Sequence, residues 1–207
     1  MTDDEIEIIH LGRTVSGTVS EAYSIMEALV NSAVAYYYCN DDNKIDEFVG
    51  FVQEHKFQFK LTYLRTIATD LDLKETDENK KILKEVSFSY LHKNNKATSD
   101  KVLATDLLKA LDYFSHLRNS FAHGVIKPIS IQKPNGKING FSFSVKDFKP
   151  ISNSGAKKGP ESIYDRIDEF TETDLKNLES DMQKMKNMLT ALLDKAKLSA
   201  DRIAYKQ

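Results

Sequence analysis

Two apolar stripes with a helical period constrain the fold of this chain more than any other feature. Along the first, the steps between apolar residues are 4, 3, 4, 3 and 4: Leu103, Leu107, Ala110, Phe114, Leu117 and Phe121. Along the second, the steps are 3, 4, 3, 4, 3 and 4: Leu175, Leu178, Met182, Met185, Leu189, Leu192 and Ala196. This spacing puts each set on one face of an α-helix, and such a face must pack against another surface to leave water. The chain is therefore predicted to form a helical bundle.

The same period marks the other predicted helices. We expect helices over residues 14–38, 45–53, 77–91, 100–123 and 171–199. The second of these can continue through a bend near His55 as far as Leu71, because apolar residues recur through that stretch. Thr98-Ser-Asp is a plausible N-cap for the fourth helix, and Gly124 is a plausible stop for it.

The segment between the last two helices has a different pattern. Ile129 and Ile131 alternate with polar residues, as do Phe141 and Phe143, and Pro134-Asn-Gly supplies a turn between the two runs. This pattern predicts a β-hairpin, in which Pro128 indicates an edge strand. Residues 150–160 are rich in Pro, Ser, Gly and Lys and are expected to form a mobile loop. The predicted fold is mainly α, a single domain over residues 1–207 with an insert at 125–160 before the C-terminal helix at 171–199.

Length and composition narrow the class of protein. A chain of 207 residues suits one domain, and 29 Lys and Arg against 31 Asp and Glu leave no overall positive charge for nucleic acid. The single cysteine, Cys39, excludes an intrachain disulfide and a zinc site of several cysteines. The N-terminus is acidic, and no stretch has the roughly 18 apolar residues of a membrane span. We expect a cytoplasmic protein without a membrane contact.

The end of the helix at 100–123 carries the most informative motif, Leu117-Arg-Asn-Ser-Phe-Ala-His-Gly. It resembles the signature of the HEPN superfamily of helical ribonucleases and nucleotide-binding proteins, in which an Arg, followed directly by a polar residue, precedes a His by a few positions. The resemblance covers these eight residues closely and the order of the helices loosely. It implies a HEPN-like bundle, and family ribonucleases usually dimerise with the two motif helices facing a shared cleft.

The three motif residues suit metal-independent cleavage of RNA, in which a 2′-hydroxyl attacks the adjacent phosphorus. We assign His123 to proton transfer, Arg118 to the phosphate, and Asn119 to orienting the imidazole or a phosphate oxygen. On an ideal helix, positions 118 and 123 lie about 140° apart. Either the last turn is distorted or the site is assembled from two chains.

Other polar residues near the motif are left out of this catalytic set. Asp112 and His116 share the polar stripe of Asn119 and His123, but His116 is interpreted as solvated or facing a partner. Glu27 and Asp112 are interpreted as ordinary helix surface. No metal-ligand spacing and no glycine-rich phosphate loop is present, so no metal or other cofactor is expected.

One local basic patch provides a predicted RNA contact. Residues 124–160 contain seven lysines and one aspartate, a net charge of 7 − 1 = +6. We assign contacts with the RNA backbone to Lys133, Lys137, Lys157 and Lys158, and packing against the bundle to the interleaved phenylalanines.

The leading hypothesis is therefore a homodimeric endoribonuclease in a toxin or anti-phage setting, a setting implied by the resemblance alone. An antitoxin or a regulatory protein is an open partner. The alternative is a non-catalytic HEPN-like interaction module that binds a protein partner or a nucleotide. Part of the run Tyr36-Tyr37-Tyr38 is expected to meet a second subunit, because the run covers too wide an arc to be buried in one core.

Overall fold

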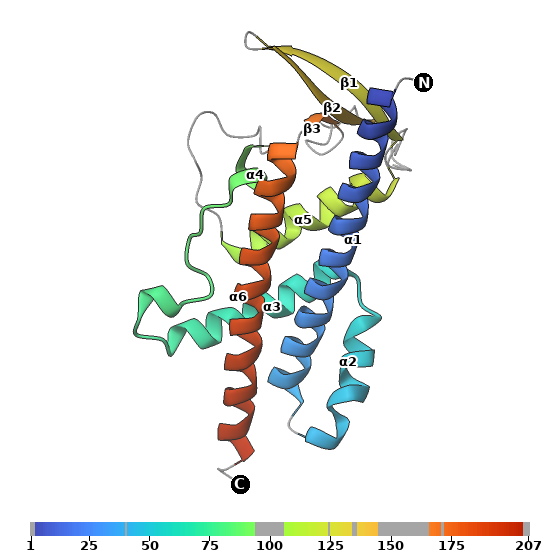
Figure 1. Ribbon diagram of the computed structural model, residues 1–207. Coiled ribbons are helices and arrows are strands. Elements are labelled where there is room, and N and C mark those ends of the chain that lie inside the picture. The colour runs from blue at the N-terminus through green and yellow to red at the C-terminus, as the bar shows by residue number, and fades with distance from the viewer. Residues whose placement is uncertain are drawn as a thin grey trace, which may run out of the picture.

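Two long helices form the frame of the molecule. The computed structural model describes residues 3–39, 41–93, 106–123, 125–133, 136–144, 166–170 and 172–204, and within these ranges the chain is mainly helical, as predicted. Helices α1 (Asp3–Tyr38) and α6 (Glu172–Ala204) run side by side in the same direction (Figure 1). The shorter helices are α2 (Ile45–Gln53), α3 (Phe57–Leu73), α4 (Ser89–Lys93) and α5 (Leu107–His123), with 3-10 turns η1 (Asp42–Lys44) and η2 (Glu78–Lys80).

The two apolar stripes form the centre of the core. The described members of the first stripe are all buried: Leu107, Ala110, Phe114, Leu117 and Phe121. The second stripe is buried from Leu178 to Ala196, and Leu175 packs at its edge. Both sets lie against the inward face of α1, whose Val15, Val19 and Met26 are also buried. The prediction of core faces from periodicity is confirmed for these helices.

The predicted bend near His55 separates two helices. Helix α2 ends at Gln53 and α3 begins at Phe57, so the interruption falls where the pattern placed it. Two boundaries extend beyond the predicted ones, because α1 begins at Asp3 and α6 continues to Ala204. The predicted N-cap at 98–100 and the loop at 150–160 lie outside the described residues.

The helix predicted over 77–91 is wrong for most of its length. Only the turn η2 and the short α4 are helical there, and the chain between them bends and extends. Two carboxylates from other elements bind this segment. Asp72 of α3 accepts hydrogen bonds from the backbone N–H groups of Ile82 and Leu83 at 2.7 Å, and Asp181 of α6 accepts three from residues 89–91. The bonds to Asp72 satisfy backbone donors without a helix, whereas those to Asp181 cap the first turn of α4. Ile82 and Tyr90 of this segment are nevertheless buried, and Leu83 and Val86 pack against the core.

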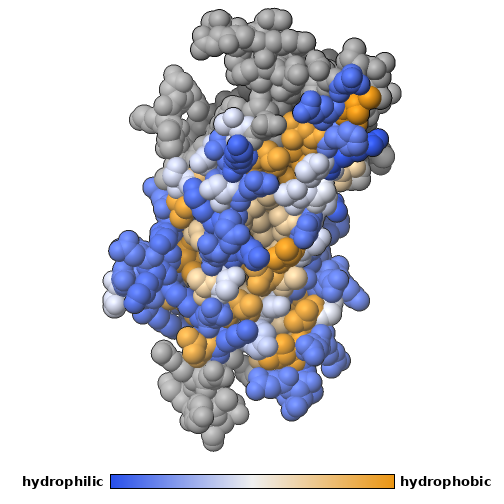
Figure 2. Space-filling view, in the orientation of Figure 1, coloured by the Kyte–Doolittle hydropathy of each residue, from blue (hydrophilic) through white to orange (hydrophobic). Residues whose placement is uncertain are grey.

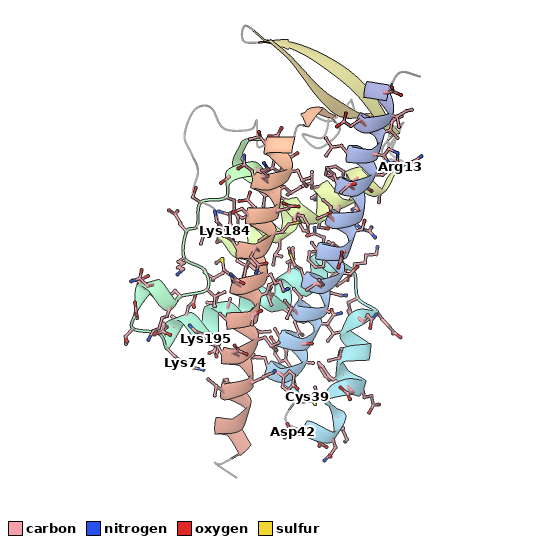
Figure 3. The ribbon with its side chains drawn as sticks, in the orientation of Figure 1. Arg13, Cys39, Asp42, Lys74, Lys184 and Lys195 are labelled. Atoms are coloured by element: carbon pink, nitrogen blue, oxygen red, sulfur yellow. The ribbon has the colours of Figure 1, made fainter. Side chains whose placement is uncertain are left out.

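A side chain on α6 also anchors the start of this segment. Lys195 donates hydrogen bonds to a carboxylate oxygen of Glu75 at 3.1 Å and to the carbonyl of Lys80 at 2.6 Å. Figure 3 shows Lys195 on α6 beside the end of α3, where Lys74 lies. The loop after α3 is thus tied to the C-terminal helix.

The described residues between α5 and α6 form three strands in the order β1-β2-β3, all antiparallel: β1 (Val125–Lys133), β2 (Gly136–Ser144) and β3 (Arg166–Phe170). Strand β1 pairs with β2 from Val125↔Ser144 to Lys133↔Gly136. Pro128 lies in β1, an edge strand of this sheet, opposite Phe141 of β2. Figure 1 places the sheet beside the N-terminal end of α1. The sequence pattern did not predict β3.

Candidate functional site

Arg118 lies on α5 and points toward α1. Its guanidinium carbon is 5.2 Å from the centre of the Tyr23 ring, a cation–π contact between the two helices. Arg118 follows Leu117, a buried member of the core stripe, so its side chain leaves α5 at the flank of the core and is half-buried. Helix geometry accounts for this position, because a residue directly after a core residue lies about 100° around the helix from it.

The donors of Arg118 are only partly used. Nη1 donates to Oδ1 of the neighbouring Asn119 at 3.1 Å, and Nε is buried without a hydrogen-bond partner. No carboxylate in the described part of the chain forms an ion pair with Arg118. Because a guanidinium carries five N–H donors and a permanent charge, this side chain retains capacity for an anion.

Tyr23 supports the guanidinium as an uncharged ring. Burial raises the pKa of the Tyr23 phenol, and the nearby Glu27 carboxylate raises it further. The hydrogen bond with Ser115 and the charge of Arg118 act in the opposite direction but do not cancel the increase. A phenol with a raised pKa stays protonated near neutral pH, so Tyr23 can stack and hydrogen-bond but does not act as a base there.

Close to Tyr23, a buried ion pair joins α1 to α3. Lys60 is fully buried, and its Nζ lies 2.7 Å from Oε1 of Glu27 and 3.2 Å from the carbonyl of Gln53 at the end of α2. Glu27 is one turn after Tyr23 on α1. The interpretation of Glu27 as ordinary helix surface is thus wrong, since its carboxylate neutralises a buried ammonium.

Sequence reasoning missed Tyr23 and Lys60. A signal for Lys60 was present, because it occupies a core position of α3, four residues before Leu64 and seven before Ile67. A lysine at such a position needs a counterion. Which carboxylate supplies it depends on a contact across 33 residues, and periodicity does not report that contact.

A second polar group lies further along α5. Gln58 on α3 donates to Oδ1 of Asp112 at 2.6 Å, and Nε2 of His116 is 3.6 Å from the same oxygen. Asn119 is exposed, and Asp112 and His116 are partly exposed. The predicted polar stripe is therefore found on the side of α5 opposite its core face.

For the remaining predicted site residues, the structure gives the backbone position or nothing. Helix α5 stays α-helical through His123, but the His123 side chain is outside the described part. Lys133 ends β1 and Lys137 is the second residue of β2, so their backbones lie at the same end of the hairpin. Lys157 and Lys158 lie outside the described residues. The structure thus brings Arg118 and Asn119 together and leaves the other five predicted positions untested.

A pocket of about 250 Å³ opens between α1 and α6, away from Arg118. It is lined by apolar Ala22, Ile25, Met26 and Met182 and by charged Glu21, Glu179 and Lys186, among others. Figure 2 shows apolar side chains along this seam between hydrophilic ones. None of its lining residues belongs to the group around Arg118.

Within the described ranges, no three His, Cys, Asp or Glu side chains are arranged to hold a metal ion, and no helix has the length and apolar character of a membrane span. The chain matches no family model, no curated protein and no solved structure. The resemblance to the HEPN superfamily therefore stays a prediction from the motif at the end of α5.

Proposed function

We propose that this protein is a metal-independent endoribonuclease that acts as a homodimer. The observation that supports this most is the half-buried Arg118: in the described part of the chain it has no carboxylate partner, and its one hydrogen bond goes to Asn119. A fixed cation with unused donors is suited to the negative charge that grows on phosphoryl oxygens during RNA cleavage.

The proposed reaction is an internal transesterification. The 2′-oxygen loses its proton and forms a bond to the adjacent phosphorus, while the bond from phosphorus to the 5′-oxygen breaks and that oxygen takes up a proton. The products are a 2′,3′-cyclic phosphate and a 5′-hydroxyl. His123 transfers the proton, Arg118 binds the phosphoryl oxygens, and Asn119 holds the Arg118 fork through its 3.1 Å hydrogen bond.

Helix geometry supports a site built from two copies. Because α5 remains α-helical to its last residue, positions 118 and 123 of one chain stay about 140° apart around the helix axis. Arg118 is directed to Tyr23 on α1, whereas position 123 continues the exposed stripe of Asn119. A twofold arrangement of α5 helices lets His123 of one copy approach the site of the other.

Cleavage of a labelled RNA in EDTA, with identification of the new ends, tests the proposal. We expect 2′,3′-cyclic ends, and a loss of roughly 100-fold or more in Arg118→Ala and in His123→Ala. The matched control is Lys109→Ala, an exposed cation on the same helix, which should cleave at the wild-type rate. A requirement for Mg²⁺, or full activity in both variants, would contradict the proposal.

The dimer and the RNA contacts have separate tests. Light scattering should give about 47 kDa, twice the 23.5 kDa chain, and a stable monomer at micromolar concentration counts against the shared site. Changing Lys133, Lys137, Lys157 and Lys158 together to Gln should weaken RNA binding. The slope of log affinity against log salt should fall by about 0.7 for each phosphate that a lysine no longer neutralises.

The alternative is a non-catalytic interaction module. This alternative is adopted if the wild-type protein cleaves no RNA. A pull-down that compares wild type with His123→Ala then tests whether the motif binds a partner. A toxin or anti-phage setting, and an antitoxin or regulatory partner, are part of the proposal only through the resemblance of the motif.

A further inference from the structure

Six aromatic side chains form a continuous series at the junction of α1, α2 and α3, which we call the aromatic ladder. The centres of successive rings are 5.0 Å apart for Tyr37–Tyr38, 6.2 Å for Tyr38–Tyr63, 6.5 Å for Tyr63–His55, 4.8 Å for His55–Phe51 and 5.8 Å for Phe51–Phe48. These distances are typical of tilted and edge-to-face aromatic pairs. The ladder is separate from Arg118 and has no role in the proposed function.

Half of the ladder is open to solvent. Phe51 is 57% exposed, and Tyr38 and Tyr63 are each 42% exposed. These exposed rings contact two members that hydrogen bonds hold in place: Tyr37 donates to Asp70 at 2.7 Å, and the ring of His55 lies within hydrogen-bond distance of the Phe51 carbonyl, at 3.0 Å. Ordered, exposed aromatic side chains that contact one another are typical of interaction surfaces.

The chain around the ladder is acidic. Residues 41–56 contain five carboxylates and two lysines, a net charge of 2 − 5 = −3, and all seven side chains are exposed: Asp41, Asp42, Lys44, Asp46, Glu47, Glu54 and Lys56. Lys44 is already paired with Asp41 at 3.8 Å. Figure 3 shows Asp42 close to Cys39, where α1 ends and the chain turns toward α2. The segment that carries Phe48, Phe51 and His55 is therefore negatively charged on its exposed surface.

We propose that the aromatic ladder and the acidic segment 41–56 form a docking surface for a basic segment of a partner protein. Arg or Lys side chains can lie over the exposed rings of Phe51, Tyr38 and Tyr63 as cation–π contacts and pair with the carboxylates of the acidic segment. RNA is disfavoured because its phosphates meet a local charge of −3. A symmetric contact with a second copy, which the sequence pattern predicted for part of the run Tyr36-Tyr37-Tyr38, is disfavoured at this surface, because a twofold axis would bring two acidic surfaces together.

Fluorescence anisotropy with a labelled model peptide tests this surface. The probe is a 12-residue peptide of alternating Arg and Leu, titrated with the full-length protein. Phe51→Ser combined with Tyr63→Ser should weaken binding about fivefold or more, since each exposed cation–π contact contributes about two- to fivefold in affinity. Asp42→Asn, Asp46→Asn and Glu47→Gln together should weaken it to a similar extent. Circular dichroism checks that both variants keep their helices.

The matched control is Leu73→Ser, which removes an apolar side chain that is 81% exposed at the far end of α3. Its peptide affinity should equal that of the wild type. The proposal is overturned if the aromatic and acidic variants bind the peptide as the wild type does, or if the control is equally weakened. It is also overturned if the aromatic variant loses RNA affinity or self-association instead, because the surface would then serve RNA or a second copy.

Discussion

Two polar side chains in the bundle, Asp181 and Arg118, have opposite surroundings. Asp181 on α6 is fully buried, and its carboxylate accepts the N–H groups of Ser89 and Tyr90 at 2.7 Å and of Leu91 at 3.0 Å. Arg118 on α5 is half-buried, and among the described residues its one hydrogen bond goes to Asn119, while none of them accepts from its Nε. The fold uses the bonding capacity of Asp181, whereas under the proposed function the remaining donors of Arg118 bind a phosphate.

Burial explains this difference. A carboxylate that loses all its water must receive hydrogen bonds from the protein, or folding would be strongly disfavoured. Arg118 keeps part of its hydration, and Tyr23 supplies a ring surface in place of a counterion. We therefore expect changes at Asp181 to act on stability and changes at Arg118 to act on function.

The largest effect is expected for Asp181→Ala. It leaves the three N–H groups that now bind Asp181 unpaired in the interior, which should cost about 3 kcal/mol of unfolding free energy and lower the melting temperature by roughly 10 °C. Thermal unfolding followed by circular dichroism measures this. The exposed neighbour Glu179→Ala is the control and should stay within about 0.5 kcal/mol of wild type. Equal stability of both variants would mean that Asp181 does not hold the 89–91 segment.

The next effect concerns the ion pair of Lys60 and Glu27, because changing one partner should lower the unfolding free energy more than changing the other. Glu27→Gln leaves the fully buried Lys60 ammonium without its counterion and should cost about 2 kcal/mol. Lys60→Met removes the charge from the interior, and the Glu27 side chain, 31% exposed, can regain water. Lys60→Met should therefore be the milder change in urea unfolding. The reverse order would show that Lys60 is hydrated.

A smaller effect, now on activity, is expected for Arg118→Lys. It keeps the positive charge and loses the planar fork of donors, so RNA cleavage should fall about tenfold. The unfolding free energy should change by less than about 0.5 kcal/mol. Initial cleavage rates measure the activity, and urea unfolding measures the unfolding free energy. The control is Arg65→Lys, at an exposed position on α3. A loss of stability without a loss of cleavage would make Arg118 a structural residue like Asp181.

The smallest effect is a pH dependence at the surface pair of Tyr37 and Asp70. Burial, together with the hydrogen bond to Asp70, raises the pKa of Tyr37 to about 12. A pKa raised by folding stabilises the folded state fully below the ordinary value of 10.0 and ceases to do so as pH rises toward 12. Tyr37→Phe should therefore cost less than about 1 kcal/mol at pH 7, and the difference from wild type should shrink by pH 11.

Urea unfolding at the two pH values measures this difference. Tyr63→Phe, without such a hydrogen bond among the described contacts, should show no shrinking. A difference that grows with pH would contradict the assigned direction. The Asp70 carboxyl behaves in the opposite sense: hydrogen bonds from Lys74 and Tyr37 lower its pKa, so its contribution is lost as pH falls below the ordinary 3.8.

Periodicity was sufficient for the long helices and their inward faces. Steps of three and four residues place Leu107 to Phe121 and Leu178 to Ala196 on single faces, and those faces are buried in the structure. The same rule failed over 77–91, where the apolar spacing was equally helical. There the outcome depended on Asp72 of α3, whose carboxylate takes the backbone donors of Ile82 and Leu83, and on Asp181, about 90 residues away, which caps the first turn of α4.

For the candidate site, the sequence by itself determined which residue types stand together at the end of one helix: Arg118, Asn119 and His123. It also determined that Arg118 leaves the helix beside the core, because the angle per residue is a local property. Only the tertiary structure decided that Tyr23 lies under the guanidinium and that Lys60 is paired with Glu27. The members of these two pairs lie 33 and 95 residues apart in the sequence. Packing between helices brings them together, and no local pattern encodes that packing.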